Sequence, residues 1–264
     1  MHFYKYQGAG NDFVMLDQRQ HRYLSRQDTA RIAELCDRRF GIGGDGLILL
    51  QLHPDYDFEM IYFNADGRES TLCGNGGRCI AAFAKHLSLV QDECRFLAID
   101  GPHEARLSTR SPLLEWVELH MSDLPSSLRE NEDFVLDTGS PHYVRFVPTV
   151  DGLDMVAEGR AVRYAERFRQ AGINVNLVSA EPSDGLRIRT YERGVEDETL
   201  ACGTGVTAAA LAAHLYRGLP AGRAEVPVWA RGGDLAVRYT AHPDGSFTDI
   251  WLCGPAARVF EGEI

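Results

Sequence analysis

Residues 73–87 read CGNGGRCIAAFAKHL, and residues 202–215 read CGTGVTAAALAAHL. Each segment places a cysteine and two glycines directly before a run of small and apolar residues that predicts a helix. The start of a helix presents backbone N–H groups without intrahelical acceptors and the positive end of the helix dipole. A cysteine there is biased toward the thiolate, and an anion beside it is stabilised. Two such cysteines favour a site with two thiol bases, which can invert a stereocentre by removing a proton from one face and returning one to the other.

The two segments also indicate an internal duplication. Aligning residues 73–86 with 202–215 gives identity at the cysteine, two glycines and two alanines. Upstream, NADG at residues 64–67 stands where YERG at residues 191–194 stands in the second half. These identities alone are equally compatible with two unrelated glycine-rich helix starts. The matched order of the surrounding elements favours a true repeat.

Alternating and apolar runs predict many strands separated by turns. In the first half, strands are expected over residues 2–6, 13–17, 47–52, 57–64, 94–99, 104–109 and 114–120. In the second half they are expected within 135–147 (strand, turn, strand) and over 173–180, 186–194, 226–230, 234–240 and 247–254. Helices are expected over 28–38, with Asp28 as N-cap, over 160–170, and after each Cys-Gly segment.

The composition is that of a globular protein rather than a membrane or nucleic-acid-binding protein. The chain has 264 residues, 44% hydrophobic and 25% charged, and no run of about 18 apolar residues that would predict a membrane span. A net charge of −11 argues against a nucleic-acid surface. The first residues lack the basic-then-apolar layout of a signal peptide, so a cytoplasmic location is expected.

The cysteine pattern predicts reduced thiols and no metal site. Six cysteines occur, and none form a Cys-x-x-Cys pair. Three of them lie within apolar runs, and Cys79 lies well inside a predicted helix, so packing is the expected role for these four: Cys36, Cys79, Cys94 and Cys253. The spacing of Cys73 and Cys79 matches no common zinc pattern.

No cofactor is expected either. Pyridoxal phosphate requires a Schiff-base lysine, and the two lysines, Lys5 and Lys85, have no phosphate-binding loop nearby. The glycines from Gly41 to Gly46 match a dinucleotide fingerprint by letter. A predicted helix precedes them and a predicted strand follows, which is the reverse of what that motif needs.

Other polar residues are candidates for a site. The turn TGSPH at residues 138–142 presents His142 at a strand start, and its ordinary pKa suits it to take a proton from a thiol; a packing role is equally compatible. Glu192 and Arg193 end a predicted strand, where arginine can clamp a carboxylate and glutamate can act as a base; an exposed ion pair is the alternative. Five asparagines lie at strand ends or turns, where they could form turns or bind an amino acid: Asn11, Asn64, Asn75, Asn174 and Asn176.

Four stretches taken together resemble the diaminopimelate epimerase family. They are KYQGAGNDF (5–13), FNADGRESTLCGNGGRC (63–79), GSPHYV (139–144) and TYERGVEDETLACGTG (190–205). Proline racemases are similar more loosely, since they share the cysteine pair but lack the long stretch before Cys202. Phenazine-biosynthesis-type isomerases share the implied fold without the paired cysteines.

The resemblance implies an α+β fold with two pseudo-symmetric lobes, each a curled, barrel-like mixed sheet around a central helix, and an active site between the lobes. Residues 1–113 with about 253–264 would form the N-terminal lobe, and residues 114–252 the C-terminal lobe. The implied activity is an isomerase: cofactor-independent epimerisation of L,L-diaminopimelate to meso-diaminopimelate, in lysine and peptidoglycan precursor biosynthesis. The implied partner is this small molecule, and no nucleic-acid or membrane partner is implied. A homodimer is compatible with the resemblance.

The resemblance also implies roles for individual residues. Cys73 and Cys202 match the two catalytic cysteines, and His142 and Glu192 match residues that help to ionise them. Residues at substrate-binding positions are Asn11, Asn64, Asn174, Glu192 and Arg193. Residues matching the helix-start amides that hold the carboxylate at the reacting centre are Gly74, Asn75, Gly203 and Thr204.

Two positions depart from part of the family. Ser140 stands where some members have asparagine, and because its hydroxyl is shorter we expect its substrate contact to be lost or to run through water. Gly46 stands where some members have glutamine. Two other functions compete with the epimerase: an amino-acid-binding protein without catalysis, for which paired cysteines have no purpose, and a redox protein that cycles Cys73 and Cys202, which would lack a Cys-x-x-Cys motif.

Overall fold

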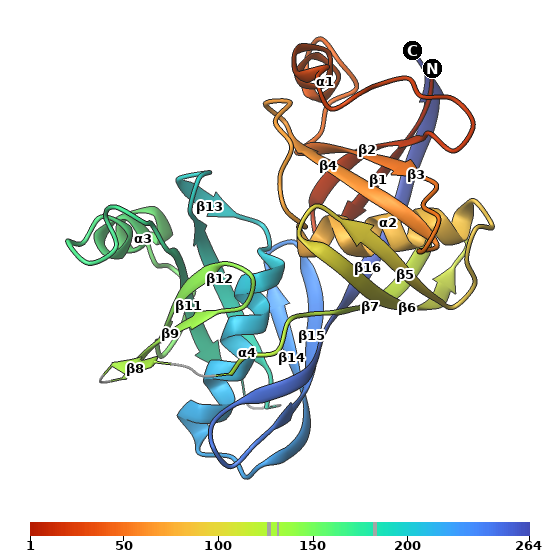
Figure 1. Cartoon of the computed structure of the whole chain (residues 1–264). Coiled ribbons are helices and arrows are strands. Elements are labelled where there is room, and N and C mark those ends of the chain that lie inside the picture. Colours follow the sequence, from red (N-terminus) through yellow and green to blue (C-terminus); the bar gives the residue numbers. More distant parts are fainter. Residues whose placement is uncertain (126–127, 131, 182–183) are drawn as a thin grey trace. The chain divides into compact units, whose positions relative to one another are not determined.

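A computed structural model describes residues 1–125, 128–130, 132–181 and 184–264 of the chain. The chain forms two compact units, one made of Met1–Leu119 and Gly254–Ile264 and the other of His120–Cys253. Within each unit, parallel and antiparallel strands curl around one helix (Figure 1). The fold class expected from the sequence is thereby confirmed.

The first unit is a closed barrel around helix α2 (Gly74–His86). Its strands are β1 (His2–Gly8), β2 (Asn11–Asp17), β3 (Gly46–Gln51), β4 (Phe58–Asn64), β5 (Glu93–Ala98), β6 (Gly101–Ser111), β7 (Leu114–His120) and the last part of β16 (Phe247–Glu263). They pair in this order, and β16 pairs back with β1, which closes the sheet. Helix α2 packs against β1, β2, β3 and β6, while α1 (Thr29–Cys36) covers β3 from the other face.

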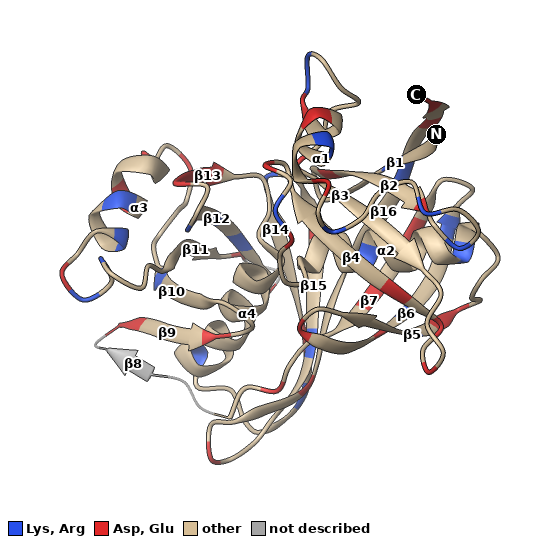
Figure 2. Ribbon diagram, turned by 45° about the horizontal axis from the view of Figure 1, so that its top comes forward, with Lys and Arg blue, Asp and Glu red and all other residues tan. Residues whose placement is uncertain are grey.

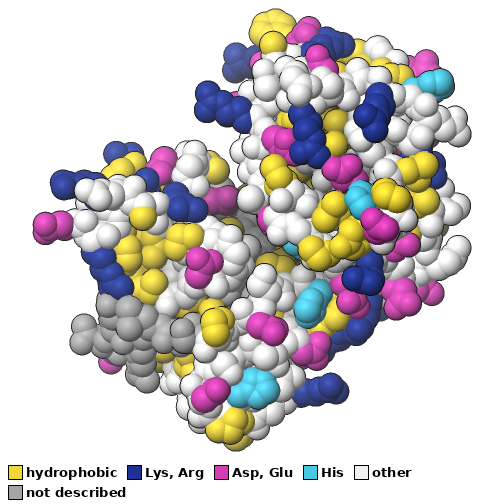
Figure 3. All heavy atoms as spheres, in the orientation of Figure 1, with side chains coloured by type: hydrophobic (Ala, Val, Ile, Leu, Met, Phe, Trp, Pro, Cys, Tyr) yellow, Lys and Arg dark blue, Asp and Glu magenta, His cyan; other side chains and the backbone are white. Residues whose placement is uncertain are grey.

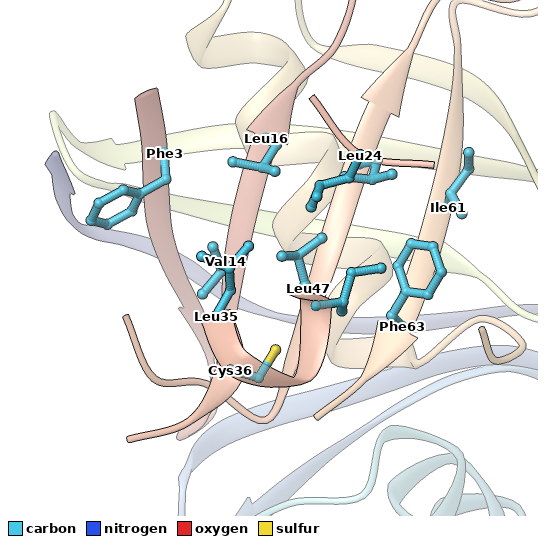
Figure 4. Packing of buried hydrophobic residues seen from close by; sticks show 11 residues of the cluster. Phe3, Val14, Leu16, Leu24, Leu35, Cys36, Leu47, Ile61 and Phe63 are labelled. Atoms are coloured by element: carbon cyan, nitrogen blue, oxygen red, sulfur yellow. The ribbon is translucent and has the colours of Figure 1, made fainter. Parts of the chain in front are cut away.

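Strand β3 shows how the sequence specifies these layers. All of its residues are buried, because each face packs against a helix. Leu47 and Leu49 belong to the apolar cluster beneath α1, shown in Figure 4. Ile48 points the other way, toward α2, where it lies next to Gly76. A continuous apolar strand is what burial on both faces requires.

The second unit is built in the same way around helix α4 (Gly203–Arg217). Its strands are β8 (Leu128–Glu130), β9 (Asp133–Asp137), β10 (Pro141–Phe146), β11 (Asn174–Ala180), β12 (Leu186–Glu192), β13 (Asp197–Thr199), β14 (Gly222–Ala230), β15 (Gly233–Ala241) and the first part of β16. Strands β8 to β12 pair consecutively, followed by β14, β15 and β16, and β13 pairs with β12. Helix α3 (Met155–Arg163) covers β11 and β12, and α4 contacts strands from β9 to β15.

The strand pairings confirm the duplication predicted from the sequence. From β1 to β6 the successive pairs are antiparallel, parallel, antiparallel, parallel and antiparallel. The pairs from β9 through β10, β11, β12 and β14 to β15 repeat this series. A covering helix follows the second strand of each series, and the central helix follows the fourth. The two Cys-Gly segments therefore begin equivalent helices.

One prediction about helices needs correction. The helix expected over 160–170 runs over Met155–Arg163, because the carboxylate of Asp154 accepts the N–H of Ala157 and caps it earlier. Asp28 is the N-cap residue of α1, as predicted, and its carboxylate accepts hydrogen bonds from Ser25. The short strands β8 and β13 were not predicted, since three residues carry too little pattern.

Charged residues lie mainly away from the central helices. Helix α4 carries its one charged residue, Arg217, at its C-terminal end, where a cation is favoured by the helix dipole (Figure 2). On the visible face of each unit, Lys and Arg side chains are interspersed with Asp and Glu (Figure 3). Among the described residues, no helix is both long and apolar enough to cross a membrane.

Candidate active site

Cys73 and Cys202 occupy equivalent positions in the two units. Each is the N-cap of its central helix, with an extended backbone (φ −90°, ψ 125° for Cys73 and φ −110°, ψ 112° for Cys202). Both side chains are partly buried. The first N–H groups of a helix have no intrahelical acceptor and lie at its positive end, so each sulfur lies where negative charge is stabilised.

Asn11 connects Cys73 to a network of polar residues. The Sγ of Cys73 lies 3.5 Å from Oδ1 of Asn11, which also accepts a hydrogen bond from Nδ2 of Asn75 (3.2 Å). The amide of Asn11 donates to Oδ2 of Asp45 (2.7 Å), which fixes its orientation. The fully buried Arg78 donates to Oδ1 of Asn75 (2.8 Å), one turn further along α2. The side chain of Asn11 therefore presents an oxygen to the thiol.

An ion cluster holds this arrangement in place. Arg38 donates to carboxylate oxygens of Asp12 (2.6 Å) and Asp45 (2.8 Å), and Lys5 lies 2.7 Å from Asp12. Burial by itself raises the pKa of Asp12, but hydrogen bonds from Arg38 and Lys5 outweigh it and lower this pKa to about 2. Asp12 is therefore ionised at neutral pH and, through Arg38, ties the loop carrying Asp45 to β2.

A second line of hydrogen bonds leads to Cys202. Oγ1 of Thr204 lies 3.5 Å from the sulfur and 2.8 Å from Nε2 of His142. Nδ1 of His142 lies 3.1 Å from Nδ2 of Asn176. The hydroxyl of Thr138 donates to the backbone oxygen of Thr204 (2.8 Å) and fixes the helix start. His142 thus lies close to the site, and it reaches Cys202 through Thr204.

The second glycine of each Cys-Gly-x-Gly segment allows close packing beneath the helix start. A Cβ at Gly205 would lie 2.5 Å from Oδ1 of Asn176 and 3.3 Å from Cε1 of His142. At Gly76, a Cβ would lie 3.3 Å from the side chain of Ile48. These glycines let the strands approach the N-terminus of each central helix.

Three residues converge at the start of β10 and β11. Nδ2 of Asn174 donates to Oγ of Ser140 (2.9 Å), and Nη2 of Arg193 lies 3.3 Å from the same oxygen. Oδ1 of Asn174 accepts the backbone N–H of Arg193 (2.8 Å). Ser140, considered in the sequence only as a shortened substrate contact, thus orients two predicted substrate-binding side chains.

The remaining predicted residues lie at strand ends near these clusters. Asn64 and Glu192 are the last residues of β4 and β12, which are equivalent strands; Asn64 is exposed and Glu192 partly buried. At Gly46, a Cβ would lie 2.6 Å from the ring of Tyr62 and 2.5 Å from the oxygen of Phe63. The backbone oxygen of Phe63 cannot move aside as a side chain can, so it opposes a glutamine at position 46.

The structure brings most of the predicted residues of each unit together. In the first unit Cys73, Asn11 and Asn75 are in contact, with Gly74 in the same helix turn. In the second unit the contacts link Cys202, Thr204 and His142, and Gly203 begins the helix. The sequence reasoning missed Asp45, which only the register of distant loops brings to Asn11. In the part of the chain that the structure describes, no group of three or more His, Cys, Asp or Glu side chains is arranged to bind a metal ion.

The buried ring of His142 predicts acid sensitivity. Burial, with a smaller effect of the Arg193 charge, lowers the pKa of His142 to about 3. The unfolded chain binds a proton below the ordinary pKa of about 6.5, whereas the folded chain does not until about 3, so folding stability falls as the pH falls between these values. We expect His142 to contribute a loss of about 2 kcal/mol between pH 7 and pH 5.

Urea unfolding of the wild type and His142→Gln at both pH values measures this contribution. The variant should lose about 2 kcal/mol less than the wild type between pH 7 and pH 5. His86 and His214, whose pKa values are also lowered by burial, remain in both proteins and cancel in the comparison. Equal losses in the two proteins would contradict the prediction.

Comparison with known proteins finds relatives along the length of the chain. The family model described as "Diaminopimelate epimerase" matches residues 3–112 and 134–258. A diaminopimelate epimerase from Flavobacterium psychrophilum is 45% identical over 265 residues, covering 100% of both chains. One from Chlorobaculum tepidum is 41% identical, covering 97% of this chain and 98% of its own.

Solved structures of lower identity share the fold. A phenazine biosynthesis protein of the PhzF family from Bacillus anthracis is 14% identical with a TM-score of 0.75, covering 100% of this chain and 98% of its own. A probable proline racemase from Agrobacterium radiobacter, with bound carbonate, is 14% identical with a TM-score of 0.68, covering 100% and 92%. Together with the family match over most of the sequence, the full-length relatives show that this chain belongs to the diaminopimelate epimerase family.

Proposed function

We propose that this chain interconverts L,L- and meso-diaminopimelate without a cofactor, with Cys73 and Cys202 as the two acid–base groups. The observation that carries the proposal is the position of the two thiols. Each is the N-cap of the central helix in one of two topologically equivalent units, and each is followed by Gly-x-Gly. The named relatives support the substrate.

The proposed reaction removes a proton from one face of the α-carbon and delivers a proton to the opposite face. One cysteine, as thiolate, takes the α-proton of the substrate and becomes a thiol. The other cysteine, as thiol, gives its proton to the opposite face of the same carbon and becomes a thiolate. The carbon is inverted, and the protonation states of the cysteines are exchanged, so they titrate as a coupled pair. This mechanism requires one α-carbon to come within reach of both sulfur atoms.

Helix-start amides address the main chemical difficulty. The α-proton of an amino acid is very weakly acidic, so negative charge that develops on the neighbouring carboxylate must be stabilised. The backbone N–H groups of Gly74 and Asn75 in α2, and of Gly203 and Thr204 in α4, lie in the first helical turns. They are suited to bind this carboxylate more strongly as charge builds on it.

Other residues are assigned to ionisation and to binding. His142 supports the ionisation of Cys202 through the hydroxyl of Thr204, and Glu192 is the second group assigned to this task. Arg193, held beside Asn174 and Ser140, offers a guanidinium for the distal carboxylate. Asn11 and Asn64 would bind the substrate from the first unit.

Proton exchange tests the proposal directly. Reduced protein without added cofactor is incubated with L,L-diaminopimelate in D2O and followed by NMR. We expect the α-proton signal to disappear while the meso isomer appears, because the proton returned comes from a thiol that has exchanged with solvent.

Two other outcomes would redirect the assignment. Exchange with proline or hydroxyproline and none with diaminopimelate would point to a racemase of cyclic amino acids, the class of a structural neighbour. No exchange with any of these amino acids would favour a binding protein. Such a protein should also tolerate alkylation of both cysteines.

A further inference from the structure

Asn176 lies at the buried end of the hydrogen-bond line that leads to Cys202. This asparagine, on β11, is fully buried. Its Nδ2 donates to the backbone oxygen of Tyr143 (3.0 Å), and its Oδ1 accepts from the hydroxyl of Thr190 (3.0 Å). A backbone carbonyl can only accept, so the orientation of the amide is fixed. The group that Asn176 presents to His142 is therefore its NH2.

This contact selects one tautomer of His142. Because Nδ2 of Asn176 donates to Nδ1 of the ring, Nδ1 carries no proton. The ring is fully buried, which disfavours a charged imidazolium. The single ring proton is therefore on Nε2, which donates it to Oγ1 of Thr204.

The hydroxyl of Thr204 then has one proton and one lone pair left. Both are available to the sulfur of Cys202, 3.5 Å away. The hydroxyl can donate to a thiolate, and after rotation it can accept from a thiol. In the opposite tautomer, Nε2 would accept a hydrogen bond from the hydroxyl of Thr204. The hydroxyl would then no longer be free to donate to the thiolate of Cys202.

We propose that Asn176 is a positioning residue: by holding His142 in its Nε2–H tautomer, it keeps the hydroxyl proton of Thr204 available to Cys202. The inference rests on the proposed function, in which Cys202 alternates between thiol and thiolate, and it explains how one neighbour can serve both states. Thr204 acts here through its side-chain hydroxyl, whereas its proposed role in substrate binding uses its backbone N–H.

The surroundings of Cys73 are built differently. Its neighbour Asn11 presents Oδ1, which can accept from a thiol but cannot donate to a thiolate. The charged groups behind it include Arg78, which reaches it through Asn75, and Asp45, which accepts a hydrogen bond from Arg38. Around the Cys202 line, the titratable ring is His142 on β10, and the charge that acts on it is that of Arg193 after β12. The device inferred here concerns Cys202, which this line of contacts reaches.

Alkylation of Cys202 by iodoacetamide, followed against pH by peptide mass spectrometry, reports its ionisation. In Asn176→Asp the carboxylate accepts from Nδ1 of His142 and reverses the tautomer. We expect the alkylation midpoint of Cys202 to rise by about one pH unit or more in this variant, and in Thr204→Val. Thr204→Ser should keep the wild-type midpoint. Thr207→Val is the matched control and should also keep it, because the hydroxyl of Thr207 donates to the backbone oxygen of Gly203 within α4.

A double variant separates the effect of the His142 tautomer on the Cys202 midpoint from the direct effect of the added negative charge. If Asn176→Asp acts through the hydroxyl, adding it to Thr204→Val causes no further shift, whereas a direct charge effect would add a second one. An additive shift, or an unchanged midpoint in Asn176→Asp, overturns the proposal. Nitrogen-15 NMR of the His142 ring in the wild type tests it without any variant: Nε2–H supports it, and Nδ1–H overturns it.

Epimerisation measured on the same wild-type sample distinguishes the two levels of inference. If the protein is an active epimerase but the variants do not shift the alkylation midpoint of Cys202, the proposed function stands and the proposed role of Asn176 is wrong. If the protein is inactive but shows the expected tautomer of His142 and the expected midpoint shifts, the control of Cys202 ionisation stands and the proposed reaction is wrong.

Discussion

Replacing Cys73 or Cys202 with alanine is expected to lower the rate of diaminopimelate epimerisation by at least about 1,000-fold. Inversion needs a base on one face of the α-carbon and an acid on the other, so either variant lacks one of the two steps. Each cysteine is a partly buried N-cap residue, and we expect both variants to fold. Conversion of the L,L isomer to the meso isomer, measured by chiral chromatography, checks the rate.

Isotope exchange makes this prediction sharper. A variant with one remaining thiol can still remove the proton from its own face and return a deuteron to that face. We therefore expect residual deuterium incorporation with retained configuration for one isomer. Cys79→Ala is the matched control, because Cys79 lies in the same helix α2 as the Cys73 cap, and burial raises its pKa to about 12. It should remain active, and near-normal activity of either Cys73→Ala or Cys202→Ala would refute the two-thiol mechanism.

Replacing Gly159 with alanine is expected to destabilise the second unit by about 2 kcal/mol or more, although alanine is the better helix former. Gly159 lies on the buried face of α3, where an added Cβ would lie 2.4 Å from both Cβ and Cγ of Tyr191. Tyr191 is fully buried on β12, and its Cβ is fixed to the strand backbone, so a rotamer change cannot relieve the clash. The gain of about 1 kcal/mol in helix propensity is smaller than this cost.

Urea unfolding of Gly159→Ala and Ala161→Gly separates these two effects. Ala161 is exposed on the same helix, so Ala161→Gly reports helix propensity alone and should cost about 1 kcal/mol. Gly159→Ala should cost more, despite the opposite change in propensity. Because Glu192 follows Tyr191 on β12, activity should fall with stability. A Gly159→Ala protein as stable as the wild type would show that α3 can move away from β12.

Much of the fold was predictable because burial leaves a periodic pattern in the sequence. The continuous apolar run of β3 and the mostly apolar sequence of β4 predicted their strands directly. The start of α3 was missed, because Gly159 interrupts its pattern. That glycine is required by contact with Tyr191, which is distant in sequence, so local propensity could not explain it.

The site was predictable only where the residues that carry its chemistry are adjacent in the sequence. The two thiols stand out because Cys-Gly-x-Gly directly precedes each helix. Asn11 and Arg193 were candidates from their residue types and positions at strand ends, and the family resemblance assigned them to substrate binding. The support of Asn11 by Asp45 depends on a loop 34 positions away, and the role of Ser140 depends on contacts with Asn174 and Arg193. Asn176 was noticed only as one amide among five. The register that places it against Thr190 and His142 shows what its amide does.

Strand β16 completes the sheets of both units. Its residues up to Cys253 pair with β15, whereas from Gly254 onward they pair with β7 and β1. Without the residues from Gly254 onward, the first unit would keep two open sheet edges, one along β7 and one along β1. Unpaired edges invite intermolecular pairing, so a chain cut before Gly254 would combine a second unit that keeps its strand pairings with an aggregation-prone first unit.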